Sequence, residues 1–355
     1  MNATRFGLPG FAVRRRPRWA RLPGLVLAWC AAIGSPPLLG VWGAAGAADG
    51  TEWTLAGEPV PRRETLEISG AACAPDGRCI LVGDEGRRAR FFTIEELPGE
   101  RPRIVIGAAV PLAPVEGDGE ADAEAVAFDR GRFYVVGSHG APRKTGDRQP
   151  SRYSVYRIEA DGGRVVASGA LARIVGAADG IRNAFCAAGG RRPCPTLQNG
   201  GANIEGLAVR DGTMHVGFRA PSPGGRAFVV SVPEQAVFGQ AAPAAAVSRL
   251  ALGSDRRGRE RGVRDLAPVA GGFLVLAGPA LPEGDAARSG AVVFFWSGPG
   301  GRAVPLRPVG LERKGVKPEA LLVLGEDAAS YRVLVIHDGV EGGAPTEHRV
   351  RKPRG

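Results

Sequence analysis

Several residue types and motifs are scarce in this chain of 355 residues. Aromatic side chains make up 6% of it, and there are four histidines. No G-x-S-x-G nucleophile elbow, Walker phosphate loop or H-E-x-x-H zinc motif occurs in the sequence. The absence of these motifs excludes the α/β-hydrolase, P-loop and zincin classes in their sequence-recognisable forms.

Long uninterrupted apolar runs are also lacking. The longest apolar stretch lies in the first 47 residues, where Pro36 and Pro37 break it, and it follows an arginine-rich segment. Together with the small residues Ala45-Gly46-Ala47, this pattern predicts a signal peptide over residues 1–47. A transmembrane anchor is the alternative, but the interrupted run is short for a span, and a lipoprotein box at Cys30 fits less well. We expect a periplasmic or secreted protein with no membrane span after signal cleavage.

Positive charge is concentrated in the same leader. The formal net charge is +10, but residues 1–47 hold six arginines and no acid, which leaves +4 for residues 48–355. Such a balance is typical of an ordinary solvated surface and not of a nucleic-acid footprint. We therefore expect no nucleic-acid partner, and a monomer whose partner is a small molecule or a protein.

Cysteine is rare, and its spacing is informative. Of the five cysteines, Cys30 lies in the leader and the other four form two close pairs. One pair flanks the turn sequence APDGR and the other brackets a glycine-rich loop, so we expect two local disulfides in an oxidising compartment. The histidines do not lie at zinc-finger spacings from these cysteines. The predicted pairs are Cys73 with Cys79 and Cys186 with Cys194.

One sequence pattern is repeated five times. Each copy has a polar opener, a short apolar strand, a turn rich in Gly and Asp, and a strongly β-forming strand that ends on small and polar residues. The copies span 68–86, 123–140, 204–221, 263–279 and 318–339. Their openers are Ser69, Glu124, Glu205, Asp265 and Glu319, spaced by 55, 81, 60 and 54 residues.

Repeats of this length with several strands each predict an all-β fold, a β-propeller of five or six blades. A β-sandwich would explain the alternation but not the five copies. We expect one domain over residues 48–355, closed by the segment EWTLAGEPV (52–60), which would complete the last blade. The longest interval contains the 165–202 loop. Only EELPGE (95–100) and the alanine-rich region 234–246 are candidate helices.

Propeller geometry would gather the openers around the central axis. Crowded carboxylates repel one another unless cations compensate them or some remain protonated. In one interpretation Arg219, Arg264 and Lys317 pair with them in a structural belt. In the other, Ca²⁺ binds among carboxylate and amide oxygens. The candidate metal ligands are Asp84, Glu124, Asn203, Glu205 and Glu319.

Three functional hypotheses follow from these two interpretations. With a metal, His139 or His337 would act as general base and Arg219 would hold an anionic substrate group, giving hydrolysis of an ester, phosphoester or lactone. The second hypothesis is a non-catalytic propeller that binds a small ligand or a protein. The third is a purely structural module.

The segments ISGAACAPDGRCILVGDEG, NIEGLAVRDGTMHVGFRAP, VRDLAPVAGGFLVLAGP and KPEALLVL…LVIHDG resemble a bacterial family named domain of unknown function 3616, over about residues 64–340. The E-G-L-A opener is more distantly similar to phytase-like esterase propellers, a resemblance that implies calcium binding or hydrolysis of esters and lactones. Ser69 and Asp265 depart from the glutamate of that opener. The resemblance therefore supports the fold and export more than the chemistry.

Overall fold

The computed structural model describes residues 50–354, apart from residues 143–146, 162, 179–180, 182–201, 240–244, 282–289 and 312. All of them belong to one compact unit, Leu39–Gly355. The predicted signal peptide over 1–47 and the predicted Cys186–Cys194 disulfide lie outside the described residues. No helix within the described ranges is both long and apolar enough to cross a membrane.

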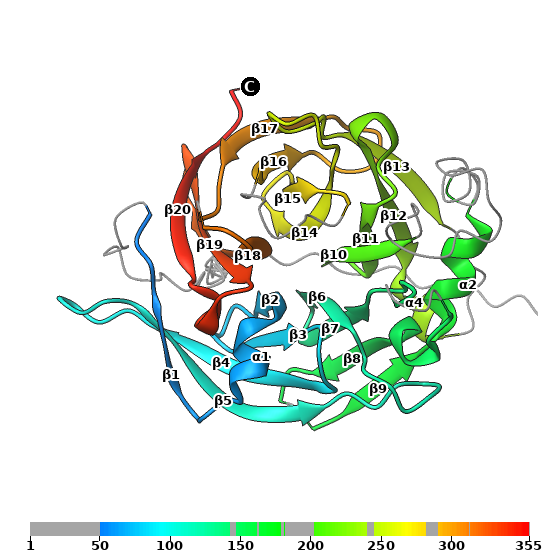
Figure 1. The fold of residues 1–355 in the computed structure, drawn as a ribbon, viewed down its shortest axis with the longest axis horizontal. Helices are drawn as coiled ribbons and strands as arrows, with labels where there is room; N and C mark the ends of the chain where they lie inside the picture. The colour runs from blue at the N-terminus through cyan, green and yellow to red at the C-terminus, as the bar shows by residue number, and fades with distance from the viewer. Residues whose placement is uncertain are drawn as a thin grey trace, which may run out of the picture. The chain divides into compact units, whose positions relative to one another are not determined.

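The described strands form five sheets arranged as a five-bladed β-propeller, with one sheet per blade (Figure 1). Blade 1 contains β2 (Ile68–Cys73), β3 (Cys79–Gly83), β4 (Arg88–Glu95), β5 (Arg103–Pro111) and β1 (Thr54–Gly57). Blade 2 contains β6 (Ala123–Asp129), β7 (Arg132–Gly137), β8 (Val155–Glu159) and β9 (Val165–Ser168). Blade 3 contains β10 (Asn203–Arg210), β11 (Thr213–Ala220), β12 (Arg226–Pro233) and β13 (Ala246–Ala251). Blade 4 contains β14 (Arg261–Val269), β15 (Gly272–Pro279), β16 (Val292–Trp296) and β17 (Ala303–Pro308). Blade 5 contains β18 (Lys317–Glu326), β19 (Ser330–Asp338) and β20 (Thr346–Arg351).

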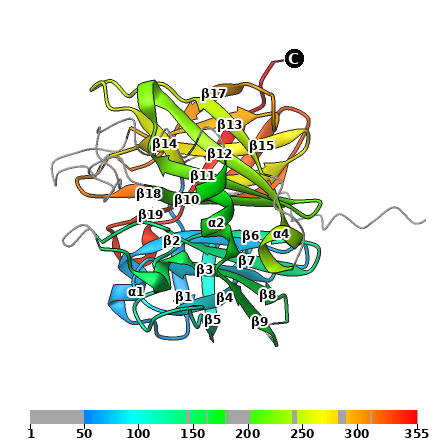
Figure 2. The same cartoon turned by 90° about the vertical axis from the view of Figure 1, so that its right-hand side faces the viewer.

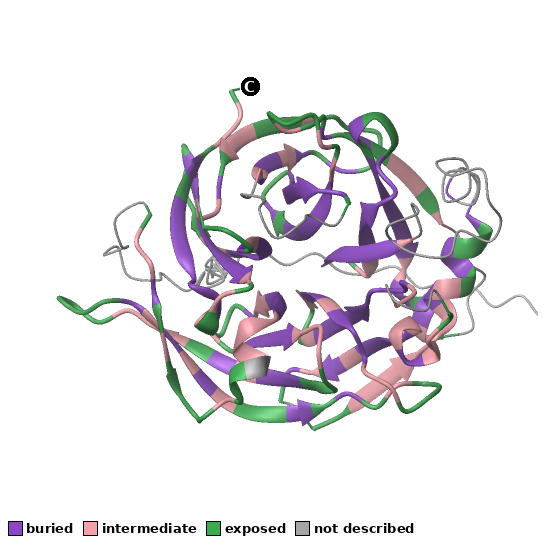
Figure 3. Ribbon diagram, in the orientation of Figure 1, coloured by how far each residue is buried: buried purple, intermediate pink, exposed green. Residues whose placement is uncertain are grey.

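Each of the five predicted repeats forms the two inner strands of one blade. The strands β2, β6, β10, β14 and β18 surround the centre of the ring, and β5, β9, β13, β17 and β20 lie at its periphery (Figure 1). The apolar core is divided in the same way, since five clusters of buried side chains each join two neighbouring blades. Burial is densest along the inner strands (Figure 3). Removing these β-branched and aromatic side chains from water is the main force that holds the blades together.

A β-bulge occurs at the same place in every inner hairpin. The strand register skips one residue near the start of each inner strand, so that residue is unpaired and its side chain is re-aimed. The bulged residues are Ser69, Glu124, Glu205, Arg264 and Glu319. The sequence alignment placed Asp265 in this position in the fourth repeat. That assignment was wrong by one residue, because the bulge puts Arg264 there and pairs Asp265 with Leu276.

The N-terminal segment closes the ring differently from the prediction. Its first residues run along the last blade, where Glu52 forms an antiparallel bridge to Thr346 and the Trp53 amide donates to the carbonyl of Pro345. The strand β1 that follows then pairs in parallel with β5 of blade 1. The segment thus links the first and last blades, and the last sheet keeps three strands.

Helices are few and short. The helix α4 (Glu234–Phe238) lies in the predicted alanine-rich region, whereas EELPGE begins as the end of β4. The helices α1 (Arg62–Leu66) and α2 (Ala170–Ala177) were not predicted; α2 lies against α4 beside the junction of blades 2 and 3 (Figure 2).

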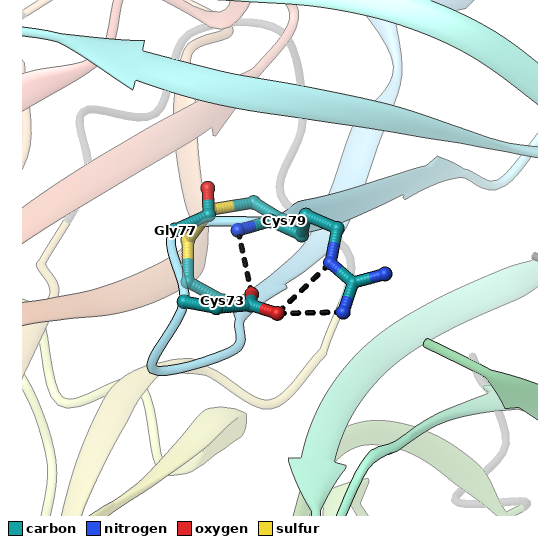
Figure 4. The surroundings of a disulfide bond; sticks show 5 residues. Cys73, Gly77 and Cys79 are labelled. Atoms are coloured by element: carbon teal, nitrogen blue, oxygen red, sulfur yellow. Dashed lines mark hydrogen bonds and ion pairs between the residues drawn. A yellow bond between two sulfur atoms is a disulfide. The ribbon is translucent and has the colours of Figure 1, made fainter. Parts of the chain in front are cut away.

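One predicted disulfide is formed. Cys73 and Cys79 are direct partners across the hairpin of β2 and β3, and their sulfur atoms are bonded (Figure 4). The bond closes the APDGR turn at the end of the hairpin away from the bulge. Such a bond is compatible with an exported protein, since disulfides persist in oxidising compartments.

Candidate functional site

The five bulges collect polar side chains at one end of the propeller axis. The end of each second strand lies beside the bulge, where blade 1 has Asp84 directly after β3 and blade 5 has Asp338 as the last residue of β19. We name this group of side chains the axial cluster. It comprises Glu67, Ser69, Asp84, Asp122, Glu124, Ser138, Asn203, Glu205, Arg219, Arg264, Lys317, Glu319 and Asp338.

Blades 3, 4 and 5 form a charge-compensated half of the axial cluster. Arg264 is 1% exposed, and its Nη1 lies 3.1 Å from Glu205 Oε2 and 2.5 Å from Glu319 Oε1. Glu205 also accepts from Arg219 Nη1 at 2.8 Å and from Asn203 Nδ2 at 2.7 Å. The Arg264 guanidinium of blade 4 therefore pairs with carboxylates of blades 3 and 5. This arrangement corresponds to the structural belt that was one of the two interpretations of the sequence.

Two glycines in blade 4 make room for this arrangement. A Cβ built on Gly262 would lie 1.8 Å from the backbone oxygen of Arg219, and one on Gly278 would lie 3.1 Å from Cγ of Arg264. The other blades carry side chains at these two positions, such as Lys317 and Asp338, which pair at 2.8 Å in blade 5. Blade 4 has no side chain at either position, which leaves room over its backbone for Arg219 and Arg264.

Blades 1 and 2 form the acidic half. Asp84 and Glu124 are half-buried, and neither side chain makes a hydrogen bond or ion pair with any residue in the described part of the chain. Burial raises the pKa of Asp84 to about 8, and the charges of Asp338 and Asp122 add to the effect. Burial also raises the pKa of Glu124 well above its ordinary value, with Glu205, Asp122 and Asp84 as the nearest like charges. These two carboxyls lack the cations that the opposite half possesses.

Two strained backbone positions lie beside the acidic half. Asp122 and His139 both have left-handed φ angles, of 48° and 55°, although neither is glycine. Asp122 is held by Ser138 Oγ and by Arg152 Nη1 at 2.9 Å, yet burial keeps its pKa raised to about 6. Strained positions of this kind persist where surrounding contacts enforce them, and they cluster at functional sites.

The two predicted general bases are enclosed. His139 Nδ1 lies 2.9 Å from the carbonyl oxygen of Gly137, and His337, with no exposed surface, lies 3.1 Å from that of Ala344. Burial lowers the pKa of each to about 4. Both imidazoles are therefore neutral at pH 7, and each Nε2 is buried without a hydrogen-bond partner among the described residues.

The predicted metal ligands are divided between the two halves. Asn203, Glu205 and Glu319 lie within the arginine network, whereas Asp84 and Glu124 face the axis from the other side. Across the described residues, no three His, Cys, Asp or Glu side chains are gathered as a preassembled metal site. Sequence reasoning missed Glu67, Asp122 and Ser138, although their positions two residues before an opener or directly after a second strand were available as a signal.

Comparison with known proteins identifies a family over part of the chain. The family described as "Protein of unknown function (DUF3616)" matches residues 193–288. This match agrees with the predicted resemblance over these residues. It covers the inner strands of blade 3 and of blade 4. No curated protein matches the chain.

Solved structures that are similar to the chain share little sequence with it. A GH43_1 enzyme from Xanthomonas citri has 12% identity and a TM-score of 0.43, with 83% of this chain and 90% of that chain covered. An exo-beta-1,3-galactanase from Phanerochaete chrysosporium has 11% identity and a TM-score of 0.42, covering 85% of this chain and only 63% of the galactanase chain. A virginiamycin B lyase from Staphylococcus aureus has 9% identity and a TM-score of 0.34, with 82% and 96% covered.

Proposed function

We propose that the chain is a ligand-binding propeller whose axial cluster takes a cation on its acidic half. The observation that carries this proposal is the asymmetry of the cluster. Glu205 and Glu319 have Arg219 and Arg264 beside them, whereas no cation among the described residues forms an ion pair with Asp84 or Glu124. A bound cation would offset the burial and the neighbouring like charges that raise the pKa of these two carboxyls.

Ca²⁺ is the first ion to test. It takes six to eight oxygen ligands in flexible geometry and accepts water in several of these positions. Asp84 and Glu124 come from neighbouring blades, so their side chains can approach one ion from two directions, with Asp122 close by as a third carboxylate. A site of this kind, completed by water or by an oxygen-bearing ligand, does not need to be preassembled before the ion binds.

Binding is favoured over hydrolysis by the state of Arg219. Its Nη1 lies 2.8 Å from Glu205 and its Nε donates to the carbonyl oxygen of Ala280 at 3.1 Å, so among the described residues only its buried Nη2 is left for a substrate anion. Hydrolysis of an ester, phosphoester or lactone is the second candidate. The observation in its favour is the unpartnered Nε2 of His139 and of His337, which, with a pKa of about 4, would be weak bases.

The test is calorimetric titration of the metal-free protein with Ca²⁺, Mg²⁺ and Zn²⁺. We expect one Ca²⁺ site that Asp84→Asn and Glu124→Gln each weaken at least tenfold and that the double variant abolishes. Glu58→Gln, which changes an exposed carboxylate on the periphery, is the matched control and should bind as the wild type does. Equal Ca²⁺ binding in the wild type and the double variant would refute the proposal.

The hydrolytic candidate needs a separate measurement. Ester, phosphoester and lactone substrates are incubated with the Ca²⁺-loaded protein and with the variants His139→Gln and His337→Gln. Turnover that either histidine variant removes, with Ca²⁺ affinity unchanged, would establish hydrolysis. Ca²⁺ binding without turnover would leave the protein as a binding module.

A further inference from the structure

A second polar pocket lies at the opposite end of blade 2 from the axial cluster. Glu124 is near the start of β6, whereas this pocket begins at the turn that joins β6 to β7 and extends to helix α4 of blade 3. Its volume is about 540 Å³. The side chains that define it are Arg130, Arg132, Arg157, Glu234 and Phe238. Neither the axial site nor its cation explains three arginines at this place.

Arg130 occupies a position where the turn favours another residue. Arg130 and Gly131 form the two-residue turn of the hairpin, with φ angles of 46° and 79°. Turns with both angles positive strongly prefer Asn, Asp or Gly at the first position. The equivalent turn of blade 3 follows this preference with Asp211 and Gly212. Blade 2 has an arginine there in spite of the strain.

The guanidinium of Arg130 is placed by a close approach to blade 3. A Cβ at Gly212 would lie 2.3 Å from Nη2 of Arg130, so the guanidinium lies directly against this turn and an alanine at Gly212 would displace it. The backbone amide of Gly212 also donates to Asp129 Oδ2 at 3.0 Å, and this carboxylate contacts Arg130. The side chain therefore lies at the junction of two blades, against the turn of blade 3.

The floor of the pocket is a partly buried ion pair. Arg157 Nη1 donates to Glu234 Oε1 at 2.8 Å, and Glu234 is only 6% exposed. The Arg157 guanidinium also lies 4.9 Å from the ring centre of Phe238. Burial and the charge of Glu234 raise the pKa of Tyr134 to about 12, so this phenol stays protonated beside the pair. The charges of Arg157 and Glu234 thus compensate each other.

The other two arginines have weaker partners. Arg130, whose side chain is 61% exposed, pairs with Asp129 at 3.0 Å. Arg132 pairs with the well-exposed Glu159 at 3.3 Å and, at the longer distance of 3.8 Å, with Glu234, the partner of Arg157. Exposed pairs of this kind contribute little to stability, because water and salt screen them. An incoming anion can take their place at small cost. Two guanidinium groups are therefore available above a neutral floor.

We propose that this pocket binds a small ligand bearing an oxyanion, a phosphate or a carboxylate, through Arg130 and Arg132. Planar guanidinium groups bind such oxyanions by pairs of parallel N–H···O bonds. Phe238 offers an apolar surface beside them for the body of the ligand. The site is independent of the cation site on the axis and would remain if no cation bound there.

The test is calorimetric titration of the full chain with inorganic phosphate and, separately, with citrate, at low chloride concentration. We expect saturable binding of at least one of them, weakened at least tenfold in Arg130→Ala and in Arg132→Gln. Arg302→Ala, which removes an exposed arginine of blade 4, is the matched control and should not change the affinity. Which probe binds more tightly distinguishes a phosphate site from a carboxylate site.

Two further results would overturn the proposal. One is the absence of saturable binding of either anion to the wild type. The other is an equal loss of affinity in Arg302→Ala, which would mean that the anions respond only to total charge. Thermal unfolding of each variant serves as the folding check, since losing an exposed ion pair should change the melting temperature very little. Gly212→Ala provides a second variant that displaces the Arg130 guanidinium without removing it.

Discussion

Replacing Arg264 by methionine tests the compensated half of the axial cluster. Methionine keeps much of the apolar stem but removes the charge that lies 3.1 Å from Glu205 and 2.5 Å from Glu319. Breaking a buried ion pair by removing one partner typically costs about 3–5 kcal/mol. Glu205 retains Arg219 at 2.8 Å, so most of the loss falls on Glu319. For a domain of this size the melting temperature should fall by about 6–10 °C.

The pH dependence of this loss identifies its cause. Burial alone would raise the pKa of Glu319, but Arg264, with Lys317 and Arg219, outweighs it and holds the pKa below its ordinary value. A carboxyl with a lowered pKa stabilises the fold above its unfolded-state pKa, and this stability is lost as the pH falls through the folded-state pKa. The deficit of Arg264→Met should therefore be largest near pH 7 and shrink toward pH 4.

Urea unfolding of the wild type, Arg264→Met and the control Arg302→Met at pH 7.5 and pH 4 measures both quantities. A deficit below about 1 kcal/mol at pH 7.5 would refute the reasoning, because it would place the arginine in the range of an exposed pair. A deficit of equal size at both pH values would attribute the loss to packing and not to charge. Arg302→Met should match the wild type throughout.

Three other predictions concern separate features of the fold. Because the folded-state pKa of Asp84 is about 8, the stability of the metal-free protein should fall as the pH rises from about 4 to 8. In chelator at pH 8, Asp84→Asn should therefore have a higher melting temperature than the wild type. A lower melting temperature would contradict this. Gly262→Ala forces a Cβ to within 1.8 Å of a backbone oxygen and should cost about 3 kcal/mol or more in urea unfolding, whereas Gly325→Ala, with open space around it, should cost little. Reducing the Cys73–Cys79 bond, whose partners are six residues apart, should lower the free energy of unfolding by about 2 kcal/mol, and an unchanged value would mean that the bond adds no constraint.

The propeller was predictable because each repeat carries its own strand pattern. The opener, the turn and the β-branched second strand recur with enough fidelity that all five inner hairpins were located from sequence. Blade closure was harder to predict. Residues 50–57 pair with two different sheets in succession, and local pattern contains no information on which sheet edge a strand will meet.

The axial cluster was only partly predictable. The polar openers were identified, but a bulge changes which side chain faces the axis, and periodicity alone placed Asp265 where Arg264 lies. The pairing of Arg264 with two carboxylates depends on Gly262 and Gly278, whose role is visible only when neighbouring blades are packed together. For the same reason, Asp84 and Glu124 could be predicted as metal ligands from the sequence. The sequence could not show that the arginines pair with Glu205 and Glu319 instead.

The account's central claim is that Asp84 and Glu124 form an uncompensated carboxyl pair that a cation can occupy. Carboxyl carbon NMR titration of the ¹³C-labelled protein, with Asp84→Asn and Glu124→Gln for assignment, tests it most directly. In the metal-free protein Asp84 should titrate near pH 8 and Glu124 well above its ordinary range, and saturating Ca²⁺ should lower both pKa values. Ordinary pKa values for both groups, unchanged by Ca²⁺, would contradict the claim.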